Sequence, residues 1–407
     1  MVTPSEQRID ALDALRGFAV LGILVMNIQT FAMPMAAYLN PTAYGSLEGV
    51  HGAVWALSHL LTDQKMMALF SMLFGAGIVL FCERAAASGK SEAGYHYRRN
   101  GWLMIFGLMH GYLLWHGDIL FLYALCAFLL FPLRNRSARS LFKLGIVFLA
   151  VSSILYLLTG FSLKSMPQEV LDEQMMPMWQ PDQSLIAAEI AAMQGNWVTQ
   201  MSARVPLTQE MQGLALFLWG FWRASGMMLL GMALYKTGIL TGAADKATYR
   251  RILLLALLVG LPVIAFGIFW NYRNEWQITS MFWGSQFNYW GSLLVSLGWM
   301  SAILLLLKNR ALSALTNRLA AVGRMAFTNY IMHTLLCGLI FYGHGLGLFG
   351  QMERAGQVLV VMGIWVFQLW LSPIWLRHFR FGPLEWLWRS LTYWQLQPMR
   401  VPRQMVS

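Results

Sequence analysis

Apolar residues fill ten long runs of this chain, and short polar segments separate one run from the next. A helix that crosses a bilayer needs about 20 mostly apolar residues. The pattern therefore predicts an all-α polytopic membrane protein, a single bundle of about ten transmembrane helices within residues 1–407. The predicted spans cover residues 14–34, 66–82, 101–116, 118–133, 140–161, 212–235, 251–270, 281–307, 320–341 and 356–376.

Two further segments are expected to be helical outside the spans. Residues 162–211 form the longest polar segment, and the arrangement of spans places it on the extracytoplasmic side, where we expect short helices, one of them over 183–193. Residues 381–396 alternate Trp with charged side chains, and Pro383 suits the first position of a helix. This second segment is predicted to be an interfacial helix at the inner leaflet.

The composition excludes most soluble classes. The chain is 57% hydrophobic and only 12% charged, whereas soluble domains carry roughly 25% charged residues. Disorder, collagen and a secreted disulfide scaffold are therefore excluded. The three cysteines lie in or beside apolar runs, so the sequence predicts neither a disulfide framework nor a metal site.

The net charge of +11 reflects membrane topology rather than nucleic-acid binding. The basic residues lie in short loops between spans, and no basic stripe follows a soluble domain. With both termini in the cytoplasm, every inner loop is basic and most of the 29 Lys and Arg residues fall inside, including Arg8 and Arg403. The positive-inside rule thus predicts a bundle whose N- and C-termini are both cytoplasmic.

Polar side chains at membrane depth are costly, so each one marks a candidate site. Arg16 precedes Asn27 by 11 residues, and Arg99 precedes His110 by the same interval. Eleven residues are close to three full helical turns and rise about 16 Å, so each pair shares a helix face. We therefore expect Asn27 and His110 in a common pocket at mid-membrane depth, above a cationic cytoplasmic mouth that includes Arg98.

This arrangement suits an elongated anionic donor from the cytosol. Arg16, Arg98 and Arg99 would bind its phosphates. His110 would act as a general base or nucleophile, and Asn27 would orient or polarise a carbonyl. The alternative reading makes the arginines topology anchors and His110 a hydrogen-bonded packing residue.

Other polar residues give further candidates for substrate binding. No Asp or Glu falls in the middle of a predicted span, so Arg223 in the sixth span has no carboxylate at matching depth; it would bind an anion or have a structural role. His116 and Asp118 lie in an outer turn, where Asp118 either caps the fourth span or, with His116, receives an outer substrate. His59, near the outer end of the second span, either reaches the same cavity or packs.

Several segments of the chain resemble the YeiB-type family of bacterial inner-membrane proteins. The resemblance covers nearly the whole chain and implies a multi-pass protein of the bacterial inner membrane in a family of unknown function. The segments are RIDALDALRGFAVLGILVMNIQTFAMP, KMMALFSMLFGAG, RRNGWLMIFGLMHGYLLWHGDILFLYA, WRASGMMLLGMALYKTG, VGRMAFTNYIMHT and FGPLEWLWRSLTYW.

The opening LDALRGFA and Asn27 are also distantly similar to the transmembrane acyltransferase superfamily, which includes heparan-α-glucosaminide N-acetyltransferase and the sugar O-acyltransferases. That similarity implies transfer of an acyl group from cytosolic acyl-CoA, a co-substrate, to an extracytoplasmic or membrane acceptor such as a glycan, a lipid or a small metabolite. Arg16 and Asn27 match positions of that pattern, and His110 or His59 would supply the imidazole.

Two other functions are compatible with the same residues. A transporter or exporter of a small anionic solute would use Arg223 and the same cavity. A non-catalytic membrane scaffold would use none of these polar residues. In every case membrane lipids are expected partners and nucleic acids are not.

Overall fold

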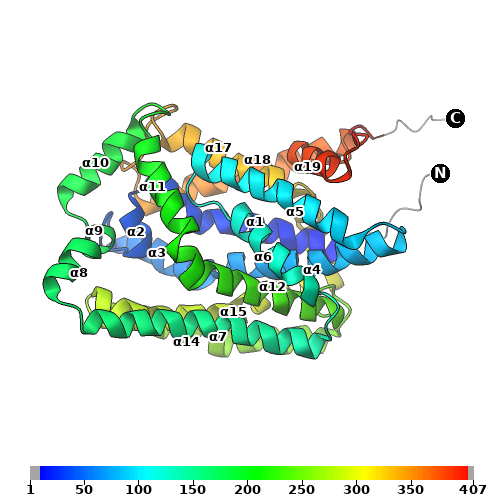
Figure 1. Ribbon diagram of the computed structural model, residues 1–407, viewed down its shortest axis with the longest axis horizontal. Coiled ribbons are helices and arrows are strands. Elements are labelled where there is room, and N and C mark those ends of the chain that lie inside the picture. The colour runs from blue at the N-terminus through cyan, green and yellow to red at the C-terminus, as the bar shows by residue number, and fades with distance from the viewer. Residues whose placement is uncertain (1–9, 402–407) are drawn as a thin grey trace.

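The computed structural model describes residues 10–401 as a bundle of helices that run mostly along its long axis (Figure 1). The described residues contain no strand, only an isolated β-bridge between Phe379 and Arg400. The elements are α1 (Asp10–Ala32), α2 (Met35–Leu39), α3 (Gly49–Leu61), α4 (Lys65–Ala87), α5 (Glu92–Met109), the π-helical η1 (His110–Leu114), α6 (Leu120–Leu130), η2 (Phe131–Leu133), α7 (Ala138–Lys164), α8 (Gln168–Gln174), α9 (Met176–Trp179), α10 (Gln183–Gln194), α11 (Met201–Gln212), the π-helical η3 (Leu216–Gly220), α12 (Phe221–Lys236), α13 (Lys246–Leu255), the π-helical η4 (Ala256–Gly260), α14 (Leu261–Arg273), α15 (Ile278–Lys308), α16 (Ser313–Arg324), α17 (Ala326–Phe341), α18 (Arg354–His378) and α19 (Pro383–Tyr393).

The predicted class, an all-α polytopic membrane protein, is confirmed. Among the described residues, seven helical segments are long and apolar enough to cross a bilayer, and two shorter apolar helices, Leu120–Leu133 and Ala326–Phe341, accompany them. Nine of the ten predicted spans follow a continuous helical segment, and the span predicted over 320–341 instead joins the end of α16 to α17 across a break at Met325. The count of ten crossings and their orientation stay predictions. The seven segments are Asp10–Ala32, Gly49–Ala87, Ala138–Lys164, Met201–Lys236, Lys246–Arg273, Ile278–Lys308 and Arg354–His378.

One of these segments corrects the sequence analysis. The second predicted span began at residue 66, but Gly49–Ala87 forms one candidate span that is interrupted between α3 and α4. Asp63 lies in this interruption and is buried. The sequence analysis began the second span after Asp63 and so overlooked this buried carboxylate, because the polar residues of the interruption split the apolar run that the sequence pattern relied on.

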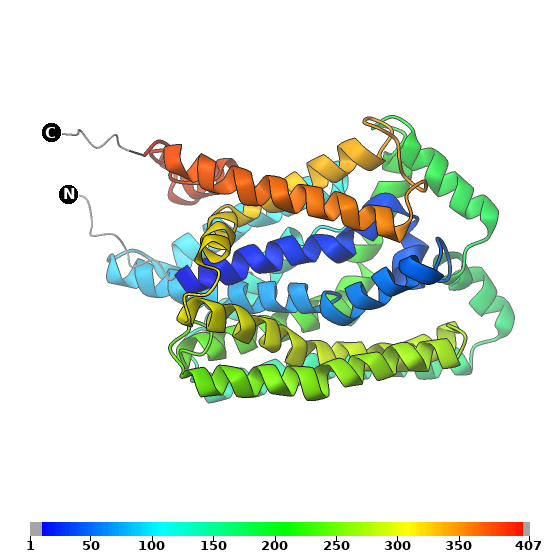
Figure 2. The ribbon, with the colours of Figure 1, turned by 180° about the vertical axis from the view of Figure 1, so that it is seen from behind.

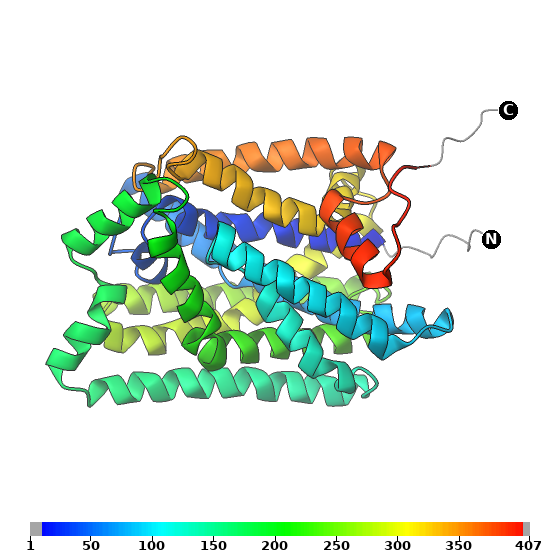
Figure 3. The same ribbon diagram turned by 45° about the horizontal axis from the view of Figure 1, so that its top comes forward.

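The two ends of the bundle differ in structure. At one end, called the cap end here, α8, α9 and α10 pack across the ends of the long helices (Figures 1 and 2). At the other, called the basic end, α19 packs against α5 and α17 (Figure 3). Helices α10 and α19 match the two predicted extramembrane helices in position. Arg8 and Arg403, which were counted as inner-side cations, lie outside the described residues.

Small residues bring the central helices into close contact. A Cβ atom at Gly75 of α4 would clash with the carbonyl oxygen of Met228 in α12, and one at Gly231 of α12 would clash with that of Met72. A Cβ at Gly17 of α1 would likewise meet the backbone of α16. Such close backbone approach is typical of small residues in membrane helices, and it holds α1, α4 and α12 as one packed centre.

Candidate functional site

His110 lies where α5 changes from an α-helix to the π-helical turn η1. Single π-turns inside α-helices are frequent at functional sites. Helix α11 binds the carbonyl groups of this turn: Thr208 Oγ1 donates to Gly111 O at 2.9 Å, and Arg204 Nη1 donates to Leu113 O at 2.7 Å. These side-chain donors satisfy carbonyls of the π-turn and hold it in place.

The turn after η1 brings Asp118 back beside His110. Gly107 allows this approach, because a Cβ atom there would clash with the backbone N of Phe121 at the start of α6. The Phe121 N–H donates to Asp118 Oδ2 at 2.8 Å, so the carboxylate caps α6 as one of the two sequence-based readings predicted. Its other oxygen is free to meet the imidazole.

The imidazole of His110 lies between a carboxylate and a hydroxyl group. Its Nδ1 is 2.8 Å from Asp118 Oδ1, and its Nε2 is 2.9 Å from Thr334 Oγ1 on α17. His110 is 2% exposed, Thr334 is 3% exposed and the Asp118 side chain is 1% exposed. In this arrangement the carboxylate orients the imidazole, and the second imidazole nitrogen contacts a hydroxyl group. Such a group is suited to general-base chemistry.

Asn27 lies in a different part of the bundle. It lines a cavity of about 70 Å³ together with Tyr38, Asp63 and Gln64, and His110 is not among the lining residues. Ile119, next to Asp118 in the chain, is the lining residue that comes nearest in sequence to the His110 group.

The face of α1 that packs toward the neighbours of His110 is apolar. Leu24, Ile28 and Phe31 of α1 belong to one buried cluster with Trp115 and Tyr330, the aromatic neighbours of His110. One residue step turns a helix by about 100°, so Ile28 and not Asn27 points toward that cluster. The structure therefore does not bring Asn27 and His110 into a common pocket.

A network of polar side chains surrounds Asp63 in the interruption between α3 and α4. Asn288 Nδ2 of α15 donates to Asp63 Oδ2 at 2.7 Å, and His59 Nδ1 lies 3.1 Å from the same oxygen. Lys65 Nζ donates to the carbonyl oxygen of His59 at 2.6 Å and to Asn288 Oδ1. Gln64, between Asp63 and Lys65, has a φ of 62°, a left-handed conformation that costs free energy in a residue with a side chain.

Arg223 completes this network from α12. Its Nη2 donates to Ser292 Oγ at 2.6 Å, its Nη1 donates to Tyr289 O at 3.2 Å, and its guanidinium lies 4.3 Å from the Tyr289 ring. It also interacts electrostatically with Asp63. The prediction that Arg223 lacks a carboxylate at its depth is therefore wrong, since the helix interruption places Asp63 there.

The predicted donor-binding arginines lie at the basic end. Arg16 forms an ion pair with Asp13 at 2.9 Å and interacts electrostatically with Arg99. The guanidinium of Arg99 lies 4.3 Å from the Trp388 ring of α19, and that of Arg98 lies 4.7 Å from the Trp394 ring. Arg16 and Arg99 thus come together, and aromatic side chains at the C-terminal end of the chain cover Arg98 and Arg99.

Helix α19 is fixed to the start of α17 through Glu385. The backbone N–H groups of Phe327 and Thr328 donate to Glu385 Oε1 at 2.7 and 3.0 Å, and the Thr328 hydroxyl donates to Oε2 at 2.6 Å. Burial raises the pKa of Glu385, although these donors act in the opposite direction. The carboxylate satisfies N–H groups that the first turn of α17 would otherwise leave unpaired.

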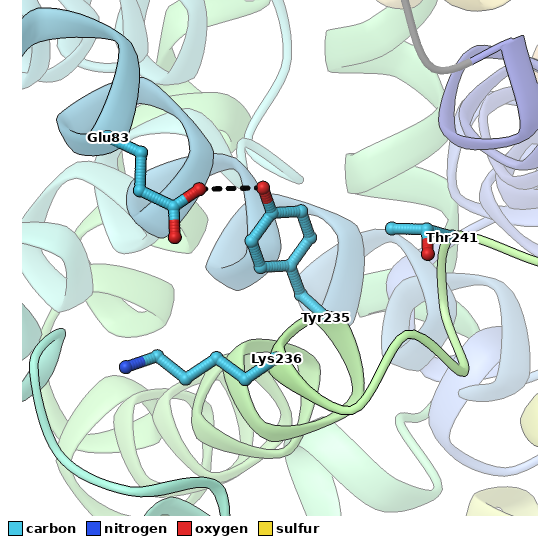
Figure 4. Close-up of a pocket in the computed structure, with 4 residues that line it drawn as sticks. All are labelled: Glu83, Tyr235, Lys236 and Thr241. Atoms are coloured by element: carbon cyan, nitrogen blue, oxygen red, sulfur yellow. Dashed lines mark hydrogen bonds between the residues drawn. The ribbon is translucent and has the colours of Figure 1, made fainter. Parts of the chain in front are cut away.

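His116 lies near His110, with which it interacts electrostatically, whereas a hollow at the C-terminal ends of α4 and α12 is separate from it. His116 is buried, and its Nε2 has no hydrogen-bond partner among the described residues. The hollow, of about 610 Å³, is lined by Glu83, Tyr235, Lys236 and Thr241; Figure 4 shows the hydrogen bond of 2.8 Å between Tyr235 and Glu83. No sequence-predicted site residue lines it, so its size alone does not identify the functional site.

The sequence analysis missed four residues of these groups: Thr334, Asp63, Lys65 and Asn288. Threonine is common in membrane helices, so the sequence gives no signal for Thr334, and Asn288 had none either. Asp63 and Lys65 had a weak signal, because the polar run 62–65 separates two apolar stretches that are each long enough to be helical.

Comparison with known proteins finds relatives along nearly the whole chain. Residues 234–395 match a family described as "Protein of unknown function (DUF418)". Uncharacterized protein YeiB of Escherichia coli (strain K12) is 34% identical over 94% of this chain and 95% of its own length. Uncharacterized protein YxaH of Bacillus subtilis (strain 168) is 31% identical over 98% of this chain and 97% of its own length. A third relative, a 39.9 kDa protein encoded 3′ of an amylase in Bacillus acidopullulyticus, is 28% identical over 98% of both chains.

Proposed function

Because the chain belongs to the YeiB-type family, whose description names no activity, we propose from the geometry around His110 that it is a membrane-bound acyltransferase. It takes an acyl group from cytosolic acyl-CoA and transfers it to an acceptor on the far side of the bacterial inner membrane or within it. The acceptor is a glycan, a lipid or a small metabolite.

The observation that carries this proposal is the buried group formed by Asp118, His110 and Thr334. Hydrogen bonds of 2.8 and 2.9 Å occupy both nitrogens of the imidazole. A base that is oriented by a carboxylate and shielded from bulk water is what acyl transfer requires, since the acceptor must lose a proton as it attacks the thioester carbonyl.

The basic end supports the donor side of the proposal. Arg16, Arg98 and Arg99 offer guanidinium groups that suit phosphates. The rise from Arg99 to His110 along α5 is about 16 Å, so only an elongated donor spans both groups. The acceptor enters from the cap end, where His116 lies two residues from Asp118.

Purified protein and labelled acetyl-CoA test the proposal. We expect saturable binding that weakens in Arg99→Gln, release of the free thiol, and transfer of label to an extract of bacterial membranes. His110→Gln should retain binding and lose thiol release by about 100-fold or more. The matched control is His378→Gln at the C-terminal end of α18, which should behave like the wild type. Neither saturable binding nor thiol release from the wild type would overturn the proposal.

The cavity beside Asn27 favours a second candidate, transport of a small solute. Broken helices whose unwound backbone lines a cavity are a feature of transporter binding sites. Here the interruption between α3 and α4 contributes Thr62, Asp63 and Gln64 to the cavity wall. This candidate predicts solute flux into liposomes without any acyl donor, with loss of flux in Asn27→Ala. Unchanged activity in both His110→Gln and Asn27→Ala would favour a scaffold.

A further inference from the structure

Within residues 10–401 Thr334 is the one hydroxyl group to which His110 hydrogen-bonds, and the sequence-based interpretation assigned it no role. Its Oγ1 lies 2.9 Å from His110 Nε2, and within the described part of the chain this is its only side-chain hydrogen bond. Hydroxyl groups in helices commonly bond to a carbonyl one turn earlier. Thr334 instead points its hydroxyl at the imidazole of another helix.

The partners of the imidazole determine where its proton lies. An ionised carboxylate only accepts hydrogen bonds, so with Asp118 at 2.8 Å the proton of His110 sits on Nδ1. Nε2 is then an acceptor, and the Thr334 hydroxyl is the donor that faces it. The three groups therefore follow the order of a catalytic triad: the carboxylate orients the imidazole, and the imidazole is placed to take the proton of the hydroxyl nucleophile.

We propose that Thr334 carries the acyl group covalently between the donor and the acceptor. This inference rests on the proposed acyltransferase function and adds an acyl-enzyme step to it. It makes Thr334 the nucleophile, His110 the base and Asp118 the positioning group.

A second feature near the imidazole fits an acyl-transfer step. The Trp115 ring centroid lies 6.0 Å from that of His110. Trp115 is 3% exposed, and its Nε1–H, which can only donate, has no acceptor among the described residues. A buried donor without an acceptor is costly, and a carbonyl oxygen that gains negative charge beside His110 would satisfy it.

The step balances in atoms and charge. Thr334 Oγ attacks the thioester carbonyl carbon of acyl-CoA while its proton passes to His110 Nε2. The carbon–sulfur bond breaks, and the departing thiolate takes that proton and leaves as the free thiol. The acceptor hydroxyl or amine then gives its proton to His110 and attacks the Thr334 ester. The bond between Thr334 Oγ and the acyl carbon breaks, and Thr334 Oγ takes back the proton from His110. This step restores the starting state.

The two transfer steps, from acyl-CoA to Thr334 and from Thr334 to the acceptor, fit the position of Thr334 and His110 between the two ends of the bundle. The donor approaches from the basic end and the acceptor from the cap end, so the two substrates meet the same hydroxyl from opposite directions. A covalent carrier lets the thiol leave before the acceptor enters a buried site.

Short incubation with labelled acetyl-CoA, acid quenching and peptide mass spectrometry test this inference. We expect label on Thr334 and none on Thr328, which lies on the same helix but contacts Glu385. Thr334→Val removes the hydroxyl at nearly constant volume and should abolish the label and lower transfer by about 100-fold or more. Thr334→Ser keeps a hydroxyl and should retain the label, which separates chemistry from folding if the valine variant is unstable.

The outcomes separate the inference from the proposed function. If the wild type releases thiol and transfers label, but Thr334 stays unlabelled and Thr334→Val keeps its rate, direct transfer through His110 replaces the covalent step while the function stands. If the wild type neither binds acetyl-CoA nor releases thiol, both fail. Label on Thr334 that disappears in His110→Gln and Thr334→Val supports the covalent step.

Discussion

Two histidines of this bundle lie beside a buried carboxylate, but their surroundings differ. His110 pairs with Asp118 at 2.8 Å next to a π-helical turn, and His59 pairs with Asp63 at 3.1 Å next to an interrupted helix. Asp63 also interacts with two cations, Lys65 and Arg223. For Asp118 the structure shows only the imidazole and the N–H of Phe121 as hydrogen-bond partners within residues 10–401.

This difference separates an electrostatic role from a chemical one. At the Asp63 network His59 shares the carboxylate with Asn288, and Lys65 and Arg223 also act on it electrostatically. At Asp118 the imidazole is the one side-chain hydrogen-bond partner within residues 10–401, so the carboxylate orients His110 alone. The comparison teaches that a buried histidine–carboxylate pair becomes a candidate base when the imidazole does not share its carboxylate with other charged side chains.

The largest effect on activity is expected from Asp118→Asn. An amide keeps the cap of α6 but removes the negative charge that orients and stabilises the imidazole. Thiol release from acetyl-CoA should fall by about 10³- to 10⁴-fold, as when the carboxylate of a hydrolase triad is replaced by an amide. The unfolding temperature should change little. Wild-type turnover in this variant would show that Asp118 is only a cap.

The largest effect on stability is expected from Asp63→Ala. It leaves Lys65 and Arg223 buried without their carboxylate, and breaking a buried charge pair typically costs about 3–5 kcal/mol. The free energy of unfolding in detergent should fall by that order. The double variant Asp63→Asn/Lys65→Met should recover part of the loss, because it removes one charge of each sign. If Asp63→Ala is as stable as the wild type, the network has no structural role.

A smaller effect is expected from Asn27→Ala. Asn27 lines the cavity beside Asp63 and does not share a pocket with His110. Thiol release should therefore change by less than about threefold, the range of a substitution outside the reacting groups. Solute flux in liposomes, measured on the same preparation, would separate transport from acyl transfer. A collapse of thiol release would mean that a conformational change brings Asn27 to the imidazole.

The sequence predicted the helices well because apolar runs of membrane length leave few alternatives. It also placed Asp118 at the cap of α6. It missed the contact between Asp118 and His110, since that contact depends on the close approach of α6 at Gly107 and on the π-turn at His110. It missed Asp63 because an interrupted helix divides its apolar pattern. The sequence analysis assumed that the faces of the two helices that carry Asn27 and His110 point toward each other. In the structure Ile28 and Phe31 instead occupy the face of α1 that packs toward Trp115.

The most direct test of the account compares His110→Gln with His59→Gln in one assay. Both substitutions remove an imidazole that pairs with a buried carboxylate, so the two variants probe the same kind of contact. Thiol release from acetyl-CoA should be lost by about 100-fold or more in His110→Gln and stay within about threefold of wild type in His59→Gln. Equal loss in both variants, or loss in His59→Gln alone, would contradict the assignment of His110 as the base.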